Sequence, residues 1–178
     1  MTAMPHIDRI EELRLGPEDD RQIAGLLERA FGTDFDGRSY FTQRHHLRLV
    51  VRQPRIVGHL GLTFRTVRAG DRLIPILGLA DVATDPDRRG QGIASALIKA
   101  AIDEGRHSPA EVMMLFGDAG LYAGHGFRPA RNRLRYVDLT GVRTCGIKDE
   151  ISDSLMILQL RGDPWPETDD IDLVGHLF

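Results

Sequence analysis

The sequence lacks several features that define whole classes of protein. Among its 178 residues there is a single cysteine, Cys145, which excludes an internal disulfide framework and fits a reducing compartment. No apolar run approaches the ~20 residues that a membrane-spanning helix needs. The first residues, MTAMPHIDRIEEL, contain no apolar signal core. We therefore expect a cytoplasmic protein without a membrane partner.

Positive charge is not in excess either. Lys and Arg number 23 against 26 Asp and Glu, giving a formal net charge of −3, whereas a general nucleic-acid binder needs a basic surface. We interpret four histidines without metal-site spacing as surface or core residues and predict no metal; they are His45, His46, His59 and His125. The hydrophobic content of 42% suits one globular domain over residues 1–178, with 161–178 as an extended acidic tail.

The spacing of apolar and turn residues predicts an alternation of strands and helices. One helix should begin at Pro17, and a second should follow Gly92 and end at Gly105. Pro75 indicates an edge or an irregular entry to its strand. The order of strand, loop, helix and strand around the second helix predicts a parallel βαβ unit and an α/β fold. Strands are expected over residues 7–15, 47–53, 55–69, 72–84, 111–117 and 154–160.

The stretch DPDRRGQGIAS, residues 85–95, raises the question of phosphate binding. Helix N-termini attract anions, and glycine lets a backbone approach a ligand closely. The P-loop pattern is absent. Gly90 and Gly92 nearly satisfy the dinucleotide pattern GxGxxG, but Ser95 takes the third glycine position and Glu111 begins a strand instead of ending one. These residues alone leave open whether the loop binds a phosphate or only starts a helix.

Two motifs together resemble a known family. Arg89, Gly92 and Ala94 fit R-x-x-G-x-A directly after the strand end VATDPD, and the segment from Tyr122 to Phe127 fits Y-x-x-x-G-F. Over residues 10–160 the chain resembles the GNAT superfamily of acyl-CoA-dependent N-acyltransferases. The resemblance implies a single domain whose mixed central sheet is flanked by helices on both faces. It also implies acetyl-CoA as cosubstrate and an amine, small or on a peptide, as acceptor; a homodimer is left open.

The resemblance also implies roles for individual residues. The Tyr122 hydroxyl would protonate the leaving thiolate, and Phe127 would lie in the core. For Asp81 two alternatives stay open: it accepts a hydrogen bond from a neighbouring backbone group, or it faces the acceptor as general base. Asp118 should cap a short helix. The pantetheine arm would bind backbone groups of Val82, Ala83 and Thr84, and the pyrophosphate would bind Arg89, Gly90, Gln91, Gly92, Ile93, Ala94 and Ser95.

Looser likenesses bear on the acceptor. The stretch AFGTDFDG and the acidic end resemble aminoglycoside 2′-N-acetyltransferases, and PWPETDDIDLVGHLF resembles the tail of nodulation N-acyltransferases. The matched substrate positions are Asp34, Asp172 and the terminal carboxylate of Phe178, which would suit a cationic amine; a solvated acidic tail is the alternative. The competing function is a CoA-binding sensor or partner-binding module without catalysis. A hydrolase is disfavoured, since the sequence contains no Gly-x-Ser-x-Gly elbow.

Overall fold

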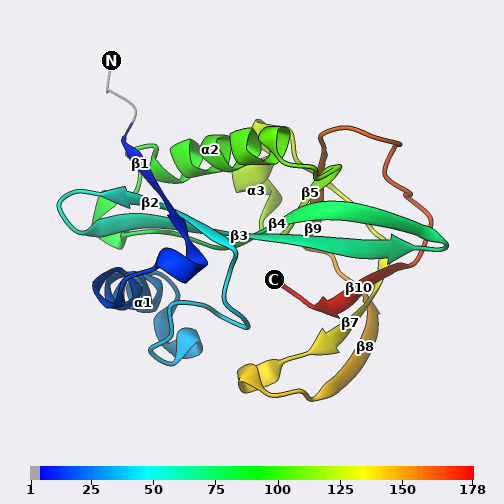
Figure 1. Cartoon of the computed structure of the whole chain (residues 1–178), viewed down its shortest axis with the longest axis horizontal. Helices are drawn as coiled ribbons and strands as arrows, with labels where there is room; N and C mark the ends of the chain where they lie inside the picture. The colour runs from blue at the N-terminus through cyan, green and yellow to red at the C-terminus, as the bar shows by residue number, and fades with distance from the viewer. Residues whose placement is uncertain (1–4) are drawn as a thin grey trace. The chain divides into compact units, whose positions relative to one another are not determined.

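The structure, a computed structural model, describes residues 5–178. Its α-helices are α1 (Pro17–Phe31), α2 (Ile93–His107) and α3 (Ala119–Tyr122). The strands are β1 (Ile7–Glu11), β2 (Leu47–Arg52), β3 (Ile56–Ala69), β4 (Arg72–Thr84), β5 (Val112–Phe116), β6 (Arg128–Pro129), β7 (Arg133–Asp138), β8 (Gly146–Ile151), β9 (Leu155–Gln159) and β10 (Ile171–His176). They form a mixed sheet in the order β6-β9-β5-β4-β3-β10-β7-β8, with β2 also pairing β3 and β1 pairing β2 (Figure 1).

The chain forms two compact units. The first runs to Thr63 and includes Ala80–Asp103, and the second comprises Phe64–Leu79 and Glu104–Phe178. The long hairpin of β3 and β4 contributes to both, because β3 leaves the first unit after Thr63 and β4 returns to it at Ala80.

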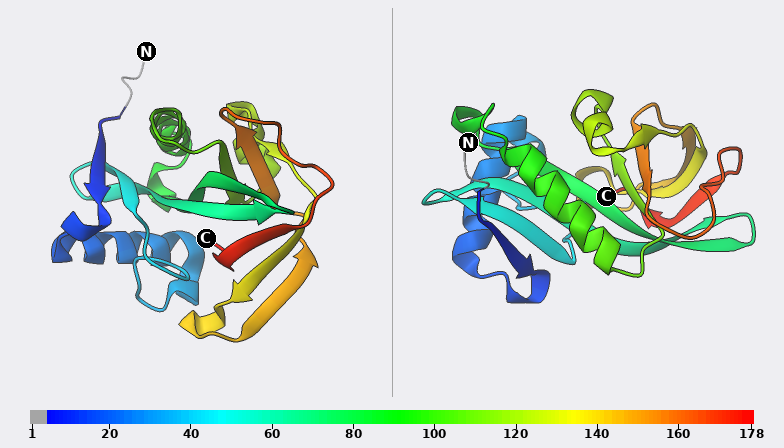
Figure 2. Two further views of the ribbon diagram at one scale, coloured as in Figure 1. Left: turned by 45° about the vertical axis from the view of Figure 1, so that its right-hand side comes forward. Right: turned by 90° about the horizontal axis from the view of Figure 1, so that it is seen from above.

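In the first unit, α1 and α2 cover opposite faces of the strands (Figure 2). Strand β2 lies antiparallel to both β1 and β3. Because side chains alternate along a strand, Val50 faces the apolar stripe of α1, while Val51 faces α2. A Cβ at Gly58 of β3 would lie 2.5 Å from Ile93 Cγ2 at the start of α2, so glycine is needed for this close approach. Residues Ile23, Leu26, Leu27, Phe35, Val50, Ile56 and Ala83 form the core beneath α1.

In the second unit, β4 pairs in parallel with β5 from Ile76 to Leu79, which confirms the predicted βαβ unit. Strand β9 then lies antiparallel to β5. On the other side, β10 lies between β3, to which it is antiparallel, and β7, to which it is parallel. The core of this unit includes Val67, Ile74, Ile76, Val112, Met114, Leu134, Ile157, Trp165, Ile171 and Leu173.

The structure differs from the expected elements in four places. Strand β10 forms within the segment that we expected to be an extended tail, and its Ile171 is fully buried. Strands β6, β7 and β8 are additional to those expected from the sequence. Helix α2 continues past Gly105, where a Cβ would lie 2.8 Å from Met113 Sδ, so this glycine serves close packing and not termination. Pro75 lies in an interior strand; its carbonyl accepts the Glu111 N–H at 2.8 Å.

None of the helices within residues 5–178 combines the length and the hydropathy needed to cross a membrane.

Candidate functional site

The loop between β4 and α2 adopts a backbone that two glycines make possible. Gly90 and Gly92 have φ values of 76° and 77°, in the left-handed region that glycine occupies without a Cβ penalty. Nothing lies within 4 Å of a Cβ built on either residue, so the loop is open on this side. The Ala96 amide donates to the Gly92 carbonyl at 2.9 Å. The preceding amides belong to the first helical turn, which has no acceptor inside the helix.

Asp85 anchors the start of this loop. Its carboxylate accepts the Asp87 N–H at 3.1 Å and pairs with Arg29 at 3.2 Å and Arg55 at 3.1 Å, although the residue is only 1% exposed. Burial alone would raise the pKa of Asp85, but the Asp87 N–H and the Arg29 guanidinium outweigh it, so the pKa is lowered. The carboxylate therefore stays charged and fixes the turn before α2. Its partners are distant in sequence, and no motif predicted this role for Asp85.

The predicted pantetheine-binding residues end strand β4. The register with β5 runs from Ile76 to Leu79, and two residues later Asp81 has φ 51°, an uncommon conformation for a residue other than glycine. Beyond Asp81, Ala83 is buried, while Val82 and Thr84 are partly exposed. The Thr84 Oγ1 atom is buried and has no hydrogen-bond partner among the described residues. Such an unpaired group is uncommon in a native fold.

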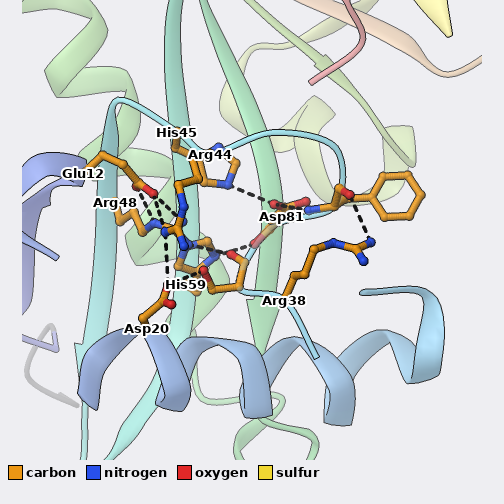
Figure 3. Close-up of polar contacts among 10 residues, drawn as sticks. Glu12, Asp20, Arg38, Arg44, His45, Arg48, His59 and Asp81 are labelled. Carbon is orange, nitrogen blue, oxygen red and sulfur yellow. Dashed lines mark hydrogen bonds and ion pairs between the residues drawn. The ribbon is translucent and has the colours of Figure 1, made fainter. Parts of the chain in front are cut away.

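The carboxylate and the main-chain carbonyl of Asp81 each contact a buried histidine side chain (Figure 3). Its Oδ2 lies 2.9 Å from Nε2 of His45 and accepts the Phe41 N–H at 3.2 Å. The side chains of His45 and Asp81 in this contact are 3% and 8% exposed. Its carbonyl oxygen lies 2.8 Å from Nδ1 of His59. Of the two alternatives for Asp81, the backbone hydrogen bond is present, through Phe41.

The histidine at the Asp81 carbonyl belongs to a longer buried chain of polar groups. Nε2 of His59 lies 3.3 Å from Nη1 of Arg48, and both residues are fully buried. Arg48 in turn donates from Nε and Nη2 to the Glu12 carboxylate at 2.7 and 2.9 Å, and from Nη1 to the Ser39 carbonyl at 2.6 Å. Burial lowers the pKa of His59 to about 3, and the Arg48 charge acts in the same direction, so this imidazole is neutral at physiological pH.

The second motif forms a short helix and a turn in the second unit. Asp118 caps α3 by accepting the Gly120 N–H at 2.8 Å, as predicted. Tyr122, 7% exposed, packs edge-on against Phe127, which lies in the core as expected. A Cβ at Gly117 would lie 2.7 Å from Tyr122 Cε2, so that glycine makes room for the ring. Burial raises the pKa of Tyr122 to about 12; the hydroxyl therefore keeps its proton at neutral pH.

The three expected acceptor-binding positions have different surroundings. Asp34 is exposed in the 3-10 turn Gly32–Phe35 of the first unit. In the second unit, the Asp172 carboxylate accepts the Val174 N–H at 2.7 Å. The Phe178 ring lies over Gly78, where a Cβ would come within 2.6 Å of it, and its centroid is 5.6 Å from the guanidinium carbon of Arg65. Phe178 is therefore a packing residue of β4 in this structure.

Sequence comparison decides the family. Residues 13–130, well over half of the chain, match the family model described as Acetyltransferase (GNAT) domain. This chain belongs to the GNAT acetyltransferase family. Among curated protein sequences, none matches the chain significantly. The resemblance seen in the two motifs is thereby confirmed at the level of the superfamily.

Solved structures agree with this family. YhbS of Escherichia coli, a GNAT family N-acetyltransferase in complex with CoA, is 22% identical with a TM-score of 0.65, over 97% of this chain and 92% of that one. A GNAT family acetyltransferase from Brucella melitensis in complex with acetyl-CoA is 21% identical (TM-score 0.59; 93% and 94% covered). The ribosomal-protein-S18-alanine N-acetyltransferase of Escherichia coli is 21% identical (TM-score 0.56; 92% and 98% covered). These likenesses show that the chain has the α/β GNAT fold.

Within this GNAT fold, sequence reasoning missed the polar residues that surround Asp81. His45 and His59 were interpreted as surface or core residues, and both are indeed buried, but their contacts with Asp81 were not foreseen. One clue was present in the sequence: Arg48 stands between Leu47 and Leu49 in a strand whose only other polar residue is the terminal Arg52, and a buried arginine needs a partner. Among residues 5–178, no three His, Cys, Asp or Glu side chains are arranged to hold a metal ion.

Proposed function

We propose that this chain transfers an acetyl group from acetyl-CoA to a primary amine by direct attack. The observation that supports this most directly is the juncture of β4 and α2. There, the left-handed Asp81, the unpaired Thr84 hydroxyl and the open Gly90–Gly92 loop follow one another within a dozen residues. Family membership adds the reaction class.

Each part of this juncture suits one part of acetyl-CoA. The backbone at the start of α2, from Arg89 to Ser95, would bind the pyrophosphate, because the positive end of a helix dipole favours an anion and the glycines let a ligand approach closely. Backbone groups of Val82 to Thr84 would bind the pantetheine arm, and the Thr84 hydroxyl would gain a partner there. The CoA and acetyl-CoA complexes of YhbS and the Brucella protein support acetyl-CoA as the ligand.

The chemistry needs one acid and one base. The amine nitrogen attacks the thioester carbon, a C–N bond forms, and the C–S bond breaks. Tyr122, whose buried hydroxyl keeps its proton, would donate that proton to the departing thiolate. Asp81 would accept the proton of the attacking amine; the hydrogen bonds from Phe41 and His45 end on Oδ2 of its carboxylate, and Oδ1 is the atom that we assign to the amine.

The acceptor is a primary amine, for which we favour cationic compounds. Asp34 and Asp172 would attract positive charge, and the likenesses to aminoglycoside 2′-N-acetyltransferases and nodulation N-acyltransferases suggest amino sugars. Because the chain is similar to the Escherichia coli S18-alanine enzyme, we also consider peptide N-termini as candidate acceptors.

The test is thiol release from acetyl-CoA and from a longer acyl-CoA with a panel of aminoglycosides, amino sugars, polyamines and peptide N-termini. Tyr122→Phe should lower kcat by about 10²-fold and leave the KM for acetyl-CoA nearly unchanged. Wild-type kcat in this variant would remove Tyr122 from the mechanism. CoA binding without thiol release across the panel would instead favour the non-catalytic module.

A second variant tests the loop. Gly92→Glu places a charged side chain at a left-handed backbone position, and should abolish acetyl-CoA binding in calorimetry. The matched control is Gly141→Glu, since Gly141 also has a positive φ of 63° and open space around its Cβ. Equal loss of affinity in both variants, or in neither, would refute the loop assignment.

A further inference from the structure

Asp81 holds an unfavourable backbone conformation that the surrounding fold must stabilise. A left-handed conformation is unfavourable for an L-residue, although aspartate tolerates it better than most. It occurs inside a 13-residue strand, immediately before Val82 to Thr84. A change at this one residue would redirect the backbone groups that follow it.

The hydrogen atoms in the network around Asp81 can be assigned by elimination. An arginine side chain only donates, so Nε2 of His59 must accept from Arg48 Nη1. The proton of the neutral ring is then on Nδ1, which donates to the Asp81 carbonyl 2.8 Å away. Because His59 is fully buried and its Nδ1 donates to a main-chain oxygen, this histidine is not placed to take a proton from substrate.

The remaining contacts leave this arrangement little freedom. The Glu12 carboxylate binds two nitrogens of Arg48, and the Ser39 carbonyl binds the third. The His45 ring lies against Gly61 of β3, where a Cβ would come within 2.5 Å of it. Side chains from β2, β3 and the segment before β2 thus converge on one residue of β4 (Figure 3).

We propose that His59, held by Arg48, is a positioning residue that fixes the left-handed conformation of Asp81 and so sets the backbone of Val82 to Thr84 for acyl-CoA. We call Arg48 and His59, with their bonds to Glu12 and the Asp81 carbonyl, the Asp81 clamp. The inference rests on the proposed function, because it needs acyl-CoA to bind these backbone groups. His59 acts through Asp81 and touches no substrate.

The first experiment replaces His59 with three side chains. In His59→Asn the amide can donate from nearly the position of Nδ1, whereas in His59→Gln it reaches toward Arg48 and in His59→Leu no donor remains. We expect the Kd for acetyl-CoA to rise about three- to tenfold in the Leu and Gln variants and to stay within about twofold in the Asn variant. His46→Leu, at an exposed histidine just before β2, is the matched control and should keep the wild-type Kd.

The kinetic constants separate positioning from simple destabilisation. A positioning role raises the KM for acetyl-CoA, whatever its effect on kcat through Asp81, the assigned base. A loss of folded protein lowers apparent kcat without changing KM. Asp81→Asn, which keeps the carbonyl and tolerates the left-handed backbone, should lower kcat without weakening acetyl-CoA binding.

A measurement on the wild-type protein does not depend on any variant folding. Carbon and nitrogen chemical shifts of His59 in NMR spectra should report the neutral ring protonated at Nδ1. Protonation at Nε2 would overturn the proposal, as would equal Kd values for all three His59 variants and wild type. If wild type itself does not bind acetyl-CoA, the proposed function fails and this inference fails with it; if only the His59 variants behave like wild type, this inference alone fails.

Discussion

The buried His59 predicts a specific acid sensitivity of the fold. Its pKa is lowered from 6.5 to about 3, first by burial and then by the Arg48 charge. In the unfolded chain the imidazole takes up a proton as the pH falls through about 6.5, while the folded protein does not until about pH 3. The unfolded state therefore binds more protons over this window, and stability is lost as the pH falls. Between pH 8 and pH 5 this one group should remove about 2 kcal/mol from the free energy of unfolding.

Urea unfolding at these two pH values, followed by far-UV circular dichroism, measures the effect. Carboxylates of the protein also titrate, so the quantity of interest is the difference between wild type and His59→Asn, in which this site no longer titrates. The variant should lose about 2 kcal/mol less than wild type on acidification, whatever its cost at pH 8. Leu60→Val, at a buried neighbour in β3, is the control for destabilisation alone and should show the full wild-type loss. Equal pH dependence in wild type and His59→Asn would refute the buried neutral state.

Three further substitutions test contacts inside the first unit or inside the second unit. Gly58→Ala should lower the free energy of unfolding by about 1–3 kcal/mol in urea denaturation, because its Cβ would lie 2.5 Å from Ile93 Cγ2; wild-type stability would contradict this contact. Gly25→Ala, in α1 with its Cβ no closer than 3.4 Å to any neighbouring atom, should instead raise stability by about 0.5–1 kcal/mol in the same assay. Asn132→Ala removes the acceptor of Trp165 Nε1 and two donations to backbone carbonyls; a loss of about 2–4 kcal/mol with a shifted tryptophan fluorescence spectrum is expected, and an unshifted spectrum would contradict it.

Local patterns predicted those elements whose formation depends on neighbouring residues. The helix from Pro17, the β3–β4 hairpin and the βαβ unit all carry their own start or turn residues, and the structure has them. Strand β10 was not predicted because its partners, β3 and β7, lie far away in sequence and an acidic, proline-rich context surrounds it. The prediction that the helix ends at Gly105 was wrong for a related reason. The sequence does not distinguish a glycine that ends a helix from one that leaves space for a distant side chain, here that of Met113.

In the candidate site, too, the residues that are close in sequence were predicted, and those that come together from distant segments were not. The segment that we propose to bind acyl-CoA is contiguous, so the sequence alone suffices to place its residues at a strand end and a helix start. The Asp81 clamp is not contiguous: Glu12, Arg48, His59 and Asp81 come from four segments. Nothing in the sequence indicates which of the many arginines pairs with which carboxylate. Only the sheet register, which sets Val50 opposite His59, brings the two strands of the clamp together.

The central position of β10 also has a consequence for how the chain is synthesised. This strand is the last one along the described residues, yet it lies between β3 and β7, some hundred residues and forty residues earlier. Until it leaves the ribosome, both neighbours present unpaired strand edges, which are sites for pairing with other chains. During synthesis the second unit should therefore be more prone to pairing with other chains than the first unit, whose strands β1 and β2 and their partner β3 are made before residue 70.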